Sequence, residues 1–257
     1  LDPLIKSSIV EGDAILHGKE FEQVITEATE IRYNSKIYEY GCIPHYKYNF
    51  IGASPDGIME NGTMIEIKCP YSRTIEGLPM KDYWVQMQLQ MECCNLNLCY
   101  FIEGKITKYE DEDDFLSDKH NEYEYLRKNG MEKGLILAFV KDGKEHCIYP
   151  KNTVKWEWDD LSKWRDVELE KLLNDDEISL IREDFFKIDT YSITPVYRDR
   201  EWFKNIFPIF DDFWNTVKEH RKNGTVPEKQ TKEKKSEWKK PEFKFPVDIE
   251  EMLIKDN

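Results

Sequence analysis

Apolar and polar positions along the chain follow helical and strand periods in turn, and each change of period marks an expected element. Apolar stripes with helical spacing cover residues 14–31 and 80–94, so both segments are predicted helices. A third stripe covers 198–221, where Pro208 is expected to kink or split the helix. The remaining expected elements are strands at 36–40, 46–51, 96–102 and 105–109, helices at 115–128 and 154–173, a hairpin of 134–140 with 144–149, and a mixed segment at 183–196.

The segment 51–70 is a predicted hairpin, because Asn61-Gly62 lies between β-branched and apolar residues. Its loop length sets which side chains share a face. A two-residue loop would pair Asp56 with Ile67 and point Asp56 away from Glu66. A three-residue loop, Glu60 to Gly62, pairs Asp56 with Glu66 if Gly62 is left-handed. We predict the three-residue loop, or another irregularity near Pro55 with the same effect.

Glu66 and Lys68 lie two residues apart on the second strand, so both side chains leave the same face. With Asp56 they bring two carboxylates and one ammonium group together. Such a group suits a hard cation such as Mg²⁺, which takes oxygen ligands and keeps several waters. The alternative is a surface hairpin with a cross-strand ion pair. The flanking Ser-Pro-Asp-Gly and Cys-Pro, and the apolar residues around Glu66 and Lys68, favour the functional interpretation.

The string G-A-S-P-D-G, followed by E-I-K-C-P, resembles the signature of the YqaJ-like viral recombinase family in the PD-(D/E)xK nuclease superfamily. This resemblance implies an α/β (α+β) restriction-endonuclease-like core, a mixed β-sheet flanked by helices. Residues 17–22, H-G-K-E-F-E, are similar to the family's G-x-x-(F/Y/L)-E helix motif, whose last Glu faces the metal. By this resemblance, Glu22 is the residue expected to face the metal, with Glu20 as the alternative.

The resemblance also implies roles for single residues. Asp56, Glu66 and the Ile67 carbonyl are expected to bind Mg²⁺ or Mn²⁺, Glu22 to hold a second ion, and Lys68 to orient or activate the attacking water. The string Tyr-x-x-Gln-x-Gln, which begins at Tyr83, resembles the helix after the catalytic strand, so Gln86 is expected near the scissile phosphate. The expected DNA contacts are Ser54, Arg73, Tyr83 and Gln88.

Charge and cysteine content narrow the possibilities. The net charge of −14 argues against broad coating of nucleic acid, although residues 221–244 hold nine Lys/Arg against four Glu. The six cysteines form no C-x-x-C pair and no zinc spacing with histidine, so an iron–sulfur nuclease of the Cas4 type is disfavoured and reduced thiols are expected. No apolar run reaches 18 residues, which predicts no membrane span and an intracellular protein, in the cytoplasm or host nucleus if viral.

Three regions are expected: an irregular segment 1–13, consistent with a truncated start, a nuclease domain 14–222, and a flexible Lys/Glu-rich tail 223–257. The family's N-terminal Arg and I/V-T-A-S string, which receive the DNA end, are not found in residues 1–13.

By resemblance, the expected function is metal-dependent hydrolysis of double-stranded DNA from a 5′ end in viral recombination. A single-strand annealing protein and a homotrimer are the expected partners. The alternatives are a structure-specific or end-independent endonuclease, and a DNA-binding module that has lost turnover.

Overall fold

The computed structural model describes residues 13–119, 133–150 and 158–226. The chain divides into two compact units, 1–208 and 209–257, and the elements up to Pro208 belong to the first unit. The predicted regions 1–13 and 223–257 lie mostly outside the described residues, so the predicted division of the chain stays a prediction.

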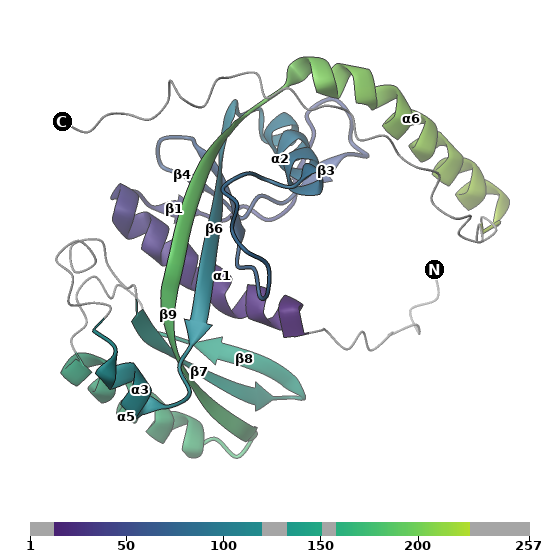
Figure 1. Ribbon diagram of the computed structural model, residues 1–257. Helices are drawn as coiled ribbons and strands as arrows, with labels where there is room; N and C mark the ends of the chain where they lie inside the picture. The colour runs from purple at the N-terminus through teal and green to yellow at the C-terminus, as the bar shows by residue number, and fades with distance from the viewer. Residues whose placement is uncertain (1–12, 120–132, 151–157, 227–257) are drawn as a thin grey trace, which may run out of the picture. The chain divides into compact units, whose positions relative to one another are not determined.

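A mixed β-sheet forms the centre of the first unit (Figure 1). Among the described residues it has seven strands, in the order β1-β4-β5-β6-β9-β7-β8. The pair β5–β6 is parallel and the other neighbours are antiparallel. The strands are β1 (Ile37–Tyr38), β4 (Gly57–Met59), β5 (Met64–Lys68), β6 (Leu98–Lys108), β7 (Lys133–Lys141), β8 (Lys144–Ile148) and β9 (Ile178–Tyr197).

Helices cover this sheet, which confirms the predicted α/β class. The described helices are α1 (Asp13–Tyr33), α2 (Lys81–Cys94), α3 (Glu112–Ser117), α5 (Trp158–Leu173) and α6 (Arg200–Asn223). Helices α1 and α2 match their predicted ranges within two residues. Helix α6 continues through Pro208, so the proline does not split the helix. None of the described helices is long and apolar enough to cross a membrane.

The two faces of β5 belong to different cores, as expected for a strand buried on both sides. Ile65 and Ile67 pack in a cluster with Phe21 and Ile25 of α1. Met64, one step along the strand, packs in a second cluster with the α2 residues. Consequently, the side chains that alternate with Ile65 and Ile67 face α2.

Strand β6 corrects one prediction, because residues 98–108 form one strand where two were expected. Gly104 lies at the expected break. A side chain there would meet Ile25, since an added Cβ would lie 2.1 Å from Ile25 Cδ1. The glycine thus serves close packing of α1 on β6 and does not end the strand; the irregularity is a bulge between Lys105 and Ile106.

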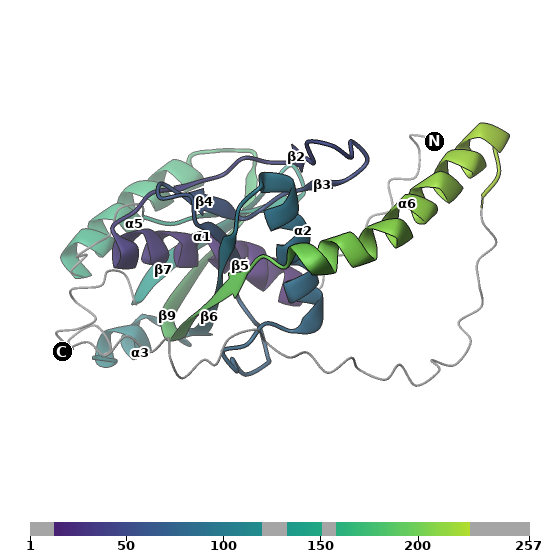
Figure 2. The same ribbon diagram turned by 90° about the horizontal axis from the view of Figure 1, so that it is seen from above.

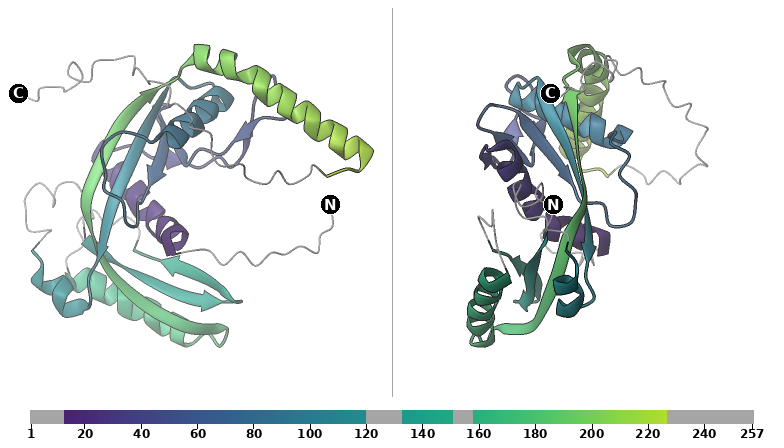
Figure 3. Two further views of the ribbon diagram at one scale, coloured as in Figure 1. Left: turned by 45° about the vertical axis from the view of Figure 1, so that its right-hand side comes forward. Right: turned by 60° about the vertical axis from the view of Figure 1, so that its left-hand side comes forward.

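Strand β9 corrects a second prediction, because the segment expected to be mixed is a strand of 20 residues. Figure 3 shows β9 curving along its length beside β6. Its first half also pairs with β7, whereas the half that holds Pro195 pairs with β6 alone. An edge position of this kind tolerates proline, which misled the sequence-based prediction.

Residues 46–51 correct a third prediction, because they form a loop and not a strand. The loop joins two short strands, β2 (Ile43–Pro44) and β3 (Gly52–Ala53), which pair as a separate small sheet. Figure 2 shows this hairpin beside α2. The predicted helix 115–128 begins as α3 and then enters residues that lie outside the described part. The hairpin through Asp142-Gly143 is confirmed, with φ of 54° and 69° at the two turn residues.

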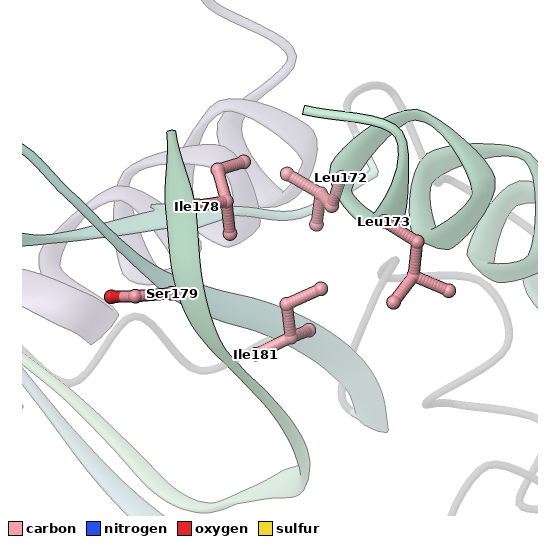
Figure 4. A pocket seen from close by; sticks show the side chains of 5 residues that line it. All are labelled: Leu172, Leu173, Ile178, Ser179 and Ile181. Atoms are coloured by element: carbon pink, nitrogen blue, oxygen red, sulfur yellow. The ribbon is translucent and has the colours of Figure 1, made fainter. Parts of the chain in front are cut away.

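A small hollow lies between the end of α5 and the start of β9 (Figure 4). It is lined by Leu172, Leu173, Ile178, Ser179 and Ile181. Roughly 35 Å of extended strand separates Ile181 from Ser192, which pairs with Glu103 near the candidate site. Four of the five lining side chains are aliphatic and the fifth is Ser179, so none of the lining side chains can carry a charge or act as an acid or a base.

Candidate active site

The hairpin β4–β5 has the three-residue loop that the sequence analysis predicted. Gly57 pairs with Ile65 and Ile58 with Met64. The Met59 N–H donates to the Thr63 carbonyl over 2.8 Å, which leaves Glu60, Asn61 and Gly62 as the loop. Gly62 has a φ of +83°, a conformation that favours glycine. One further step of this register brings Asp56 opposite Glu66, as the site requires.

The carboxylate of Glu66 is fully buried and accepts hydrogen bonds from three side chains. Lys68 and Gln86 both donate to Oε1, the amide of Gln86 over 2.7 Å. Gln90 donates to Oε2 over 2.8 Å, and its Nε2 also lies 3.2 Å from the Ser54 carbonyl. These contacts fix the orientation of Glu66 and confirm that Glu66 and Lys68 share one face of β5.

Gln90 is a residue that the sequence analysis left without a role. It follows Gln86 by four residues, so both amides project from one side of α2 toward Glu66. This spacing was the signal that would have found it. Gln90 is 2% exposed, which places its amide among the structural supports of the site rather than on its surface.

Asp56 lies beside this carboxylate and is held by the backbone of the same strand. Its Oδ2 accepts a hydrogen bond of 2.7 Å from the Ile67 N–H. Burial raises the pKa of Asp56 to about 7, and the nearby charge of Glu66 adds to this rise, while Ile67 and Lys68 oppose it. A cation between the two carboxylates would relieve their repulsion, because an opposite charge favours the ionised form.

The donor set therefore fits a magnesium-type ion. The carboxylates of Asp56 and Glu66 can supply hard oxygen atoms, and water can fill the remaining positions; the predicted role of the Ile67 carbonyl stays a prediction. No group of three or more His, Cys, Asp or Glu side chains with metal-site geometry occurs in the described parts of the chain. Glu22 thus does not complete a three-carboxylate cluster in this structure, so its role as the ligand of a second ion stays a prediction.

Glu22 nonetheless belongs to the same electrostatic environment. The residue is exposed on α1, and partial burial of its carboxyl raises its pKa. Lys68 opposes this rise, whereas Glu66 and Glu39 add to it. Glu20, the alternative, instead pairs with Lys108 at 2.9 Å and neighbours Asp184. Of the two, Glu22 is the residue whose charge interacts with the hairpin carboxylates.

Lys68 remains charged in this environment. Burial works to lower its pKa, but Glu66 and Asp56 outweigh burial and raise it. Its Nζ lies 5.2 Å from the centroid of the Tyr83 ring, an arrangement that favours a cation. A permanently charged Lys68 can orient a water and stabilise negative charge, but it has no lone pair to accept a proton.

Arg73 also lies near Tyr83, with its guanidinium carbon 5.8 Å from the ring centroid. It forms an ion pair with Glu103, which is 1% exposed and stands opposite Lys68 in the β5–β6 register. Glu103 was missed by the sequence analysis, although a carboxylate inside an otherwise apolar strand was a usable signal. The expected phosphate contact of Arg73 stays a prediction, and Glu103 is the group that positions this side chain.

Gln88 lies apart from the cluster, and its expected DNA contact stays a prediction. It is buried, donates to the Tyr197 carbonyl over 2.9 Å and accepts from the Asp199 N–H over 2.6 Å. Side chains two residues apart on a helix point to nearly opposite sides, so Gln86 faces Glu66 while Gln88 faces away from it. Ser54 is exposed, and its expected DNA contact stays a prediction.

The chain is similar to several known proteins. Residues 3–97 match the family described as the YqaJ-like viral recombinase domain, which confirms the predicted resemblance. The matched segment contains α1, the β4–β5 hairpin and α2.

The chain is also 27% identical, over 258 residues, to an uncharacterized protein of Acanthamoeba polyphaga mimivirus. That alignment covers 87% of this chain and 47% of the relative, so the chain spans about half the length of the curated relative that it matches.

Among solved structures, an alkaline exonuclease from Laribacter hongkongensis is 24% identical, with a TM-score of 0.35, and the alignment covers 63% of this chain and 68% of that one. The structure of the same exonuclease with dAMP is 25% identical, with the same TM-score and coverage of 64% and 68%.

Proposed function

We propose that this protein, which carries a YqaJ-like viral recombinase domain, is a metal-dependent deoxyribonuclease that hydrolyses double-stranded DNA, as an exonuclease acting from the 5′ end. The observation that carries the proposal is the hairpin register, which brings Asp56 opposite a buried, triply hydrogen-bonded Glu66 with Lys68 on the same face. A hairpin whose carboxylates served only solubility would not bury them among amides and apolar side chains.

Each residue has a separable task in this proposal. Asp56, Glu66 and the Ile67 carbonyl would hold Mg²⁺ or Mn²⁺, which when bound supplies a Lewis acid and a more acidic water. Gln86 and Gln90 keep the Glu66 carboxylate in one orientation. Lys68 orients the attacking water and stabilises charge that develops on the phosphate.

The substrate and partners rest on the family resemblance. Double-stranded DNA in viral-type recombination, with a single-strand annealing protein as partner and a homotrimer as the assembly, is the expectation, in the cytoplasm or nucleus of a host cell. Arg73, Tyr83 and Ser54 are proposed to contact the DNA, and Glu22 to hold a second ion. Glu22→Gln tests that last role: cleavage at the wild-type rate would restrict the mechanism to the hairpin carboxylates.

The decisive assay uses one linear duplex labelled at either 5′ or 3′ ends, beside its closed circular form, with Mg²⁺ and with EDTA. Loss of the linear form alone, with the 5′ label released first and only with Mg²⁺, is the expected result. Cutting of the circle would instead identify an end-independent endonuclease. Binding of the duplex without cleavage, in Mg²⁺ and also in Mn²⁺, would contradict the enzymatic proposal.

A further inference from the structure

The loop between β2 and β3 is held in one conformation by a buried histidine. The backbone N–H of His45 donates to the Ile51 carbonyl over 2.9 Å. The ring Nδ1 of His45 accepts from the backbone N–H groups of Lys47 and Tyr48 over 3.0 and 3.1 Å. On the other side of the ring, Nε2 lies 3.5 Å from a carboxylate oxygen of Glu92 on α2. His45 is 3% exposed, so the loop is built on a rigid support.

Stacked rings extend from this support to the surface. Tyr46 stacks on His45 with ring centroids 4.7 Å apart and planes inclined by 20°. His45 in turn stacks on Phe203 at 5.7 Å and 14°. Tyr46 is 79% exposed, whereas Phe203 is 7% exposed. The column therefore ends in an aromatic ring whose inner face is covered and whose outer face is open to solvent.

A second stack braces the same loop. Tyr48 lies on Phe207 with centroids 3.9 Å apart, and the Lys47 ammonium lies 5.0 Å from the Tyr48 ring centroid. Lys47 is exposed next to Tyr46. The loop thus offers an exposed flat ring and, on the next residue, an exposed cation, and single-stranded nucleic acid engages such groups with its bases and phosphates.

The charge of this hairpin differs from that of the chain. The protein has 51 acidic residues among 257, yet residues 41–55 include none and contain one lysine. The hairpin itself therefore holds no carboxylate that would repel phosphates, and the neighbouring Glu92 of α2 is paired with Arg198, while Lys47 attracts phosphates. This local charge favours a nucleic acid strand as the occupant over a basic protein surface.

The hairpin is also connected to the candidate active site. After β3 the chain continues through Ser54 to Asp56. At most about 18 Å of extended chain separates Ile51 from Asp56. On α2, Gln90 contacts Glu66, while Glu92 contacts His45. A strand of roughly five nucleotides, at about 3.4 Å each, would reach from one place to the other.

We propose that Tyr46 is a stacking platform for an unpaired base of the DNA strand that enters or leaves the active site. The proposal rests on the proposed nuclease function for the polymer that it assigns, but the platform makes its own contact and is tested without cleavage. Base stacking on an aromatic side chain contributes about 1–3 kcal/mol per base, so its loss is measurable in binding.

The test measures binding of a fluorescein-labelled 12-nucleotide oligo(dT) by anisotropy, in EDTA so that no strand is cut. Tyr46→Ala is expected to weaken binding about tenfold or more, and Tyr46→Phe to bind like the wild type because the ring is retained. Tyr40→Ala is the matched control, since Tyr40 is 55% exposed outside the loop; it should bind like the wild type. Circular dichroism melting curves check that each variant is folded.

A second strand, with abasic sugars in place of the thymidines, keeps the phosphates and removes the bases. Tyr46→Ala should change affinity for this strand less than twofold. Equal losses on both strands, unchanged binding by Tyr46→Ala, or no binding by the wild type would each overturn the proposal; the last two results would leave a protein partner to account for the exposed ring. Duplex cleavage with Mg²⁺, measured separately, shows whether the proposed nuclease function fails on its own.

Discussion

Glu66 depends on its neighbours more than any other acidic residue of the hairpin, because Lys68, Gln86 and Gln90 all donate to one buried carboxylate. Removal of Gln90 leaves Oε2 without its donor and frees the carboxylate to rotate, whereas Oε1 keeps one donor after the loss of either Lys68 or Gln86. Such supporting contacts in metal sites typically contribute 10- to 100-fold to activity or metal affinity. Their effect can be separated from that of the ligands themselves.

Gln90→Leu is expected to lower kcat about 10- to 100-fold while the protein stays folded, because Glu66 Oε2 loses its donor. Steady-state cleavage of a labelled duplex with Mg²⁺ measures this change. Gln23→Ala, which alters an exposed glutamine of α1, is the control and should keep wild-type activity. A Gln90→Leu enzyme within twofold of wild type would show that Gln86 and Lys68 suffice to hold Glu66.

The raised pKa of Asp56 should make metal binding depend on pH. Its pKa, raised to about 7 chiefly by burial, means that a proton competes with the metal below pH 7. Titration calorimetry with Mg²⁺ at pH 6, 7 and 8 should show affinity falling about tenfold per unit below pH 7 and levelling off above it. Asp56→Asn should bind at least about tenfold more weakly at pH 8 and lose this dependence. Wild-type affinity that stayed constant from pH 6 to 8 would exclude Asp56 as the competing group.

At the scale of elements, the contact between α1 and β6 determines where the helix that carries Glu22 lies. Gly104 allows this contact, because any side chain there would overlap Ile25. Both residues are buried, so neither can move into free space.

Gly104→Ala is expected to lower the free energy of unfolding by about 1–3 kcal/mol, the usual cost of overpacking. Urea unfolding measures it. The double variant with Gly104→Ala and Ile25→Ala should lose less unfolding free energy than the sum of the two single variants, because the smaller side chain at position 25 leaves space for the added methyl group. Gly18→Ala has no atom within 4 Å of the added Cβ and should be neutral or stabilising. Strict additivity of the two core changes would refute the proposed contact.

The ion-paired cluster around Glu20 of α1 makes the stability of the fold depend on pH. Burial raises the pKa of Glu20 to about 7; Lys108 opposes the rise and Asp184 adds to it. Because the folded pKa exceeds the unfolded value of 4.5, this group stabilises the fold below pH 4.5, and the stabilisation is lost as pH rises through 7.

Glu20→Gln cannot ionise, so relative to wild type it should gain on the order of 1–3 kcal/mol of unfolding free energy between pH 5 and pH 8. Urea unfolding of both proteins at the two pH values gives this difference directly, and contributions from other titrating groups cancel. A difference that did not change with pH would show that Lys108 keeps Glu20 ionised throughout.

At the scale of the whole molecule, the sequence predicted what depends on local chemistry. Asn61-Gly62 predicted the hairpin, and the helical stripes predicted α1 and α2. The three-residue loop was chosen over a two-residue loop because it brings Asp56 opposite Glu66, and the structure has that loop.

The sequence-based prediction failed where tertiary packing decides. The residues of β6 were predicted as two strands, although Gly104 continues the strand and allows a close contact with Ile25. Residues 183–196 were predicted as a mixed segment, although Pro195 occupies an edge position of one long strand.

The residues that support the site were harder to predict than its ligands. Gln88 and Gln90 lie on the same helix in the same kind of sequence, and only their rotation about α2 separates a contact to Glu66 from a contact to Tyr197. Glu103 and Arg73 are 30 residues apart and meet because β6 lies beside β5. No local pattern specifies such pairings, which depend on the order of strands in the sheet.

The most direct test of the central claim compares wild type with Lys68→Ala in hydrolysis of a linear duplex with Mg²⁺, while metal affinity and DNA binding are measured on the same preparations. The site predicts that Lys68→Ala binds both metal and DNA but cleaves at least about 100-fold more slowly, since it loses the group that orients water and stabilises charge on the phosphate. Cleavage by Lys68→Ala at the wild-type rate would contradict the assignment of this hairpin as the catalytic centre.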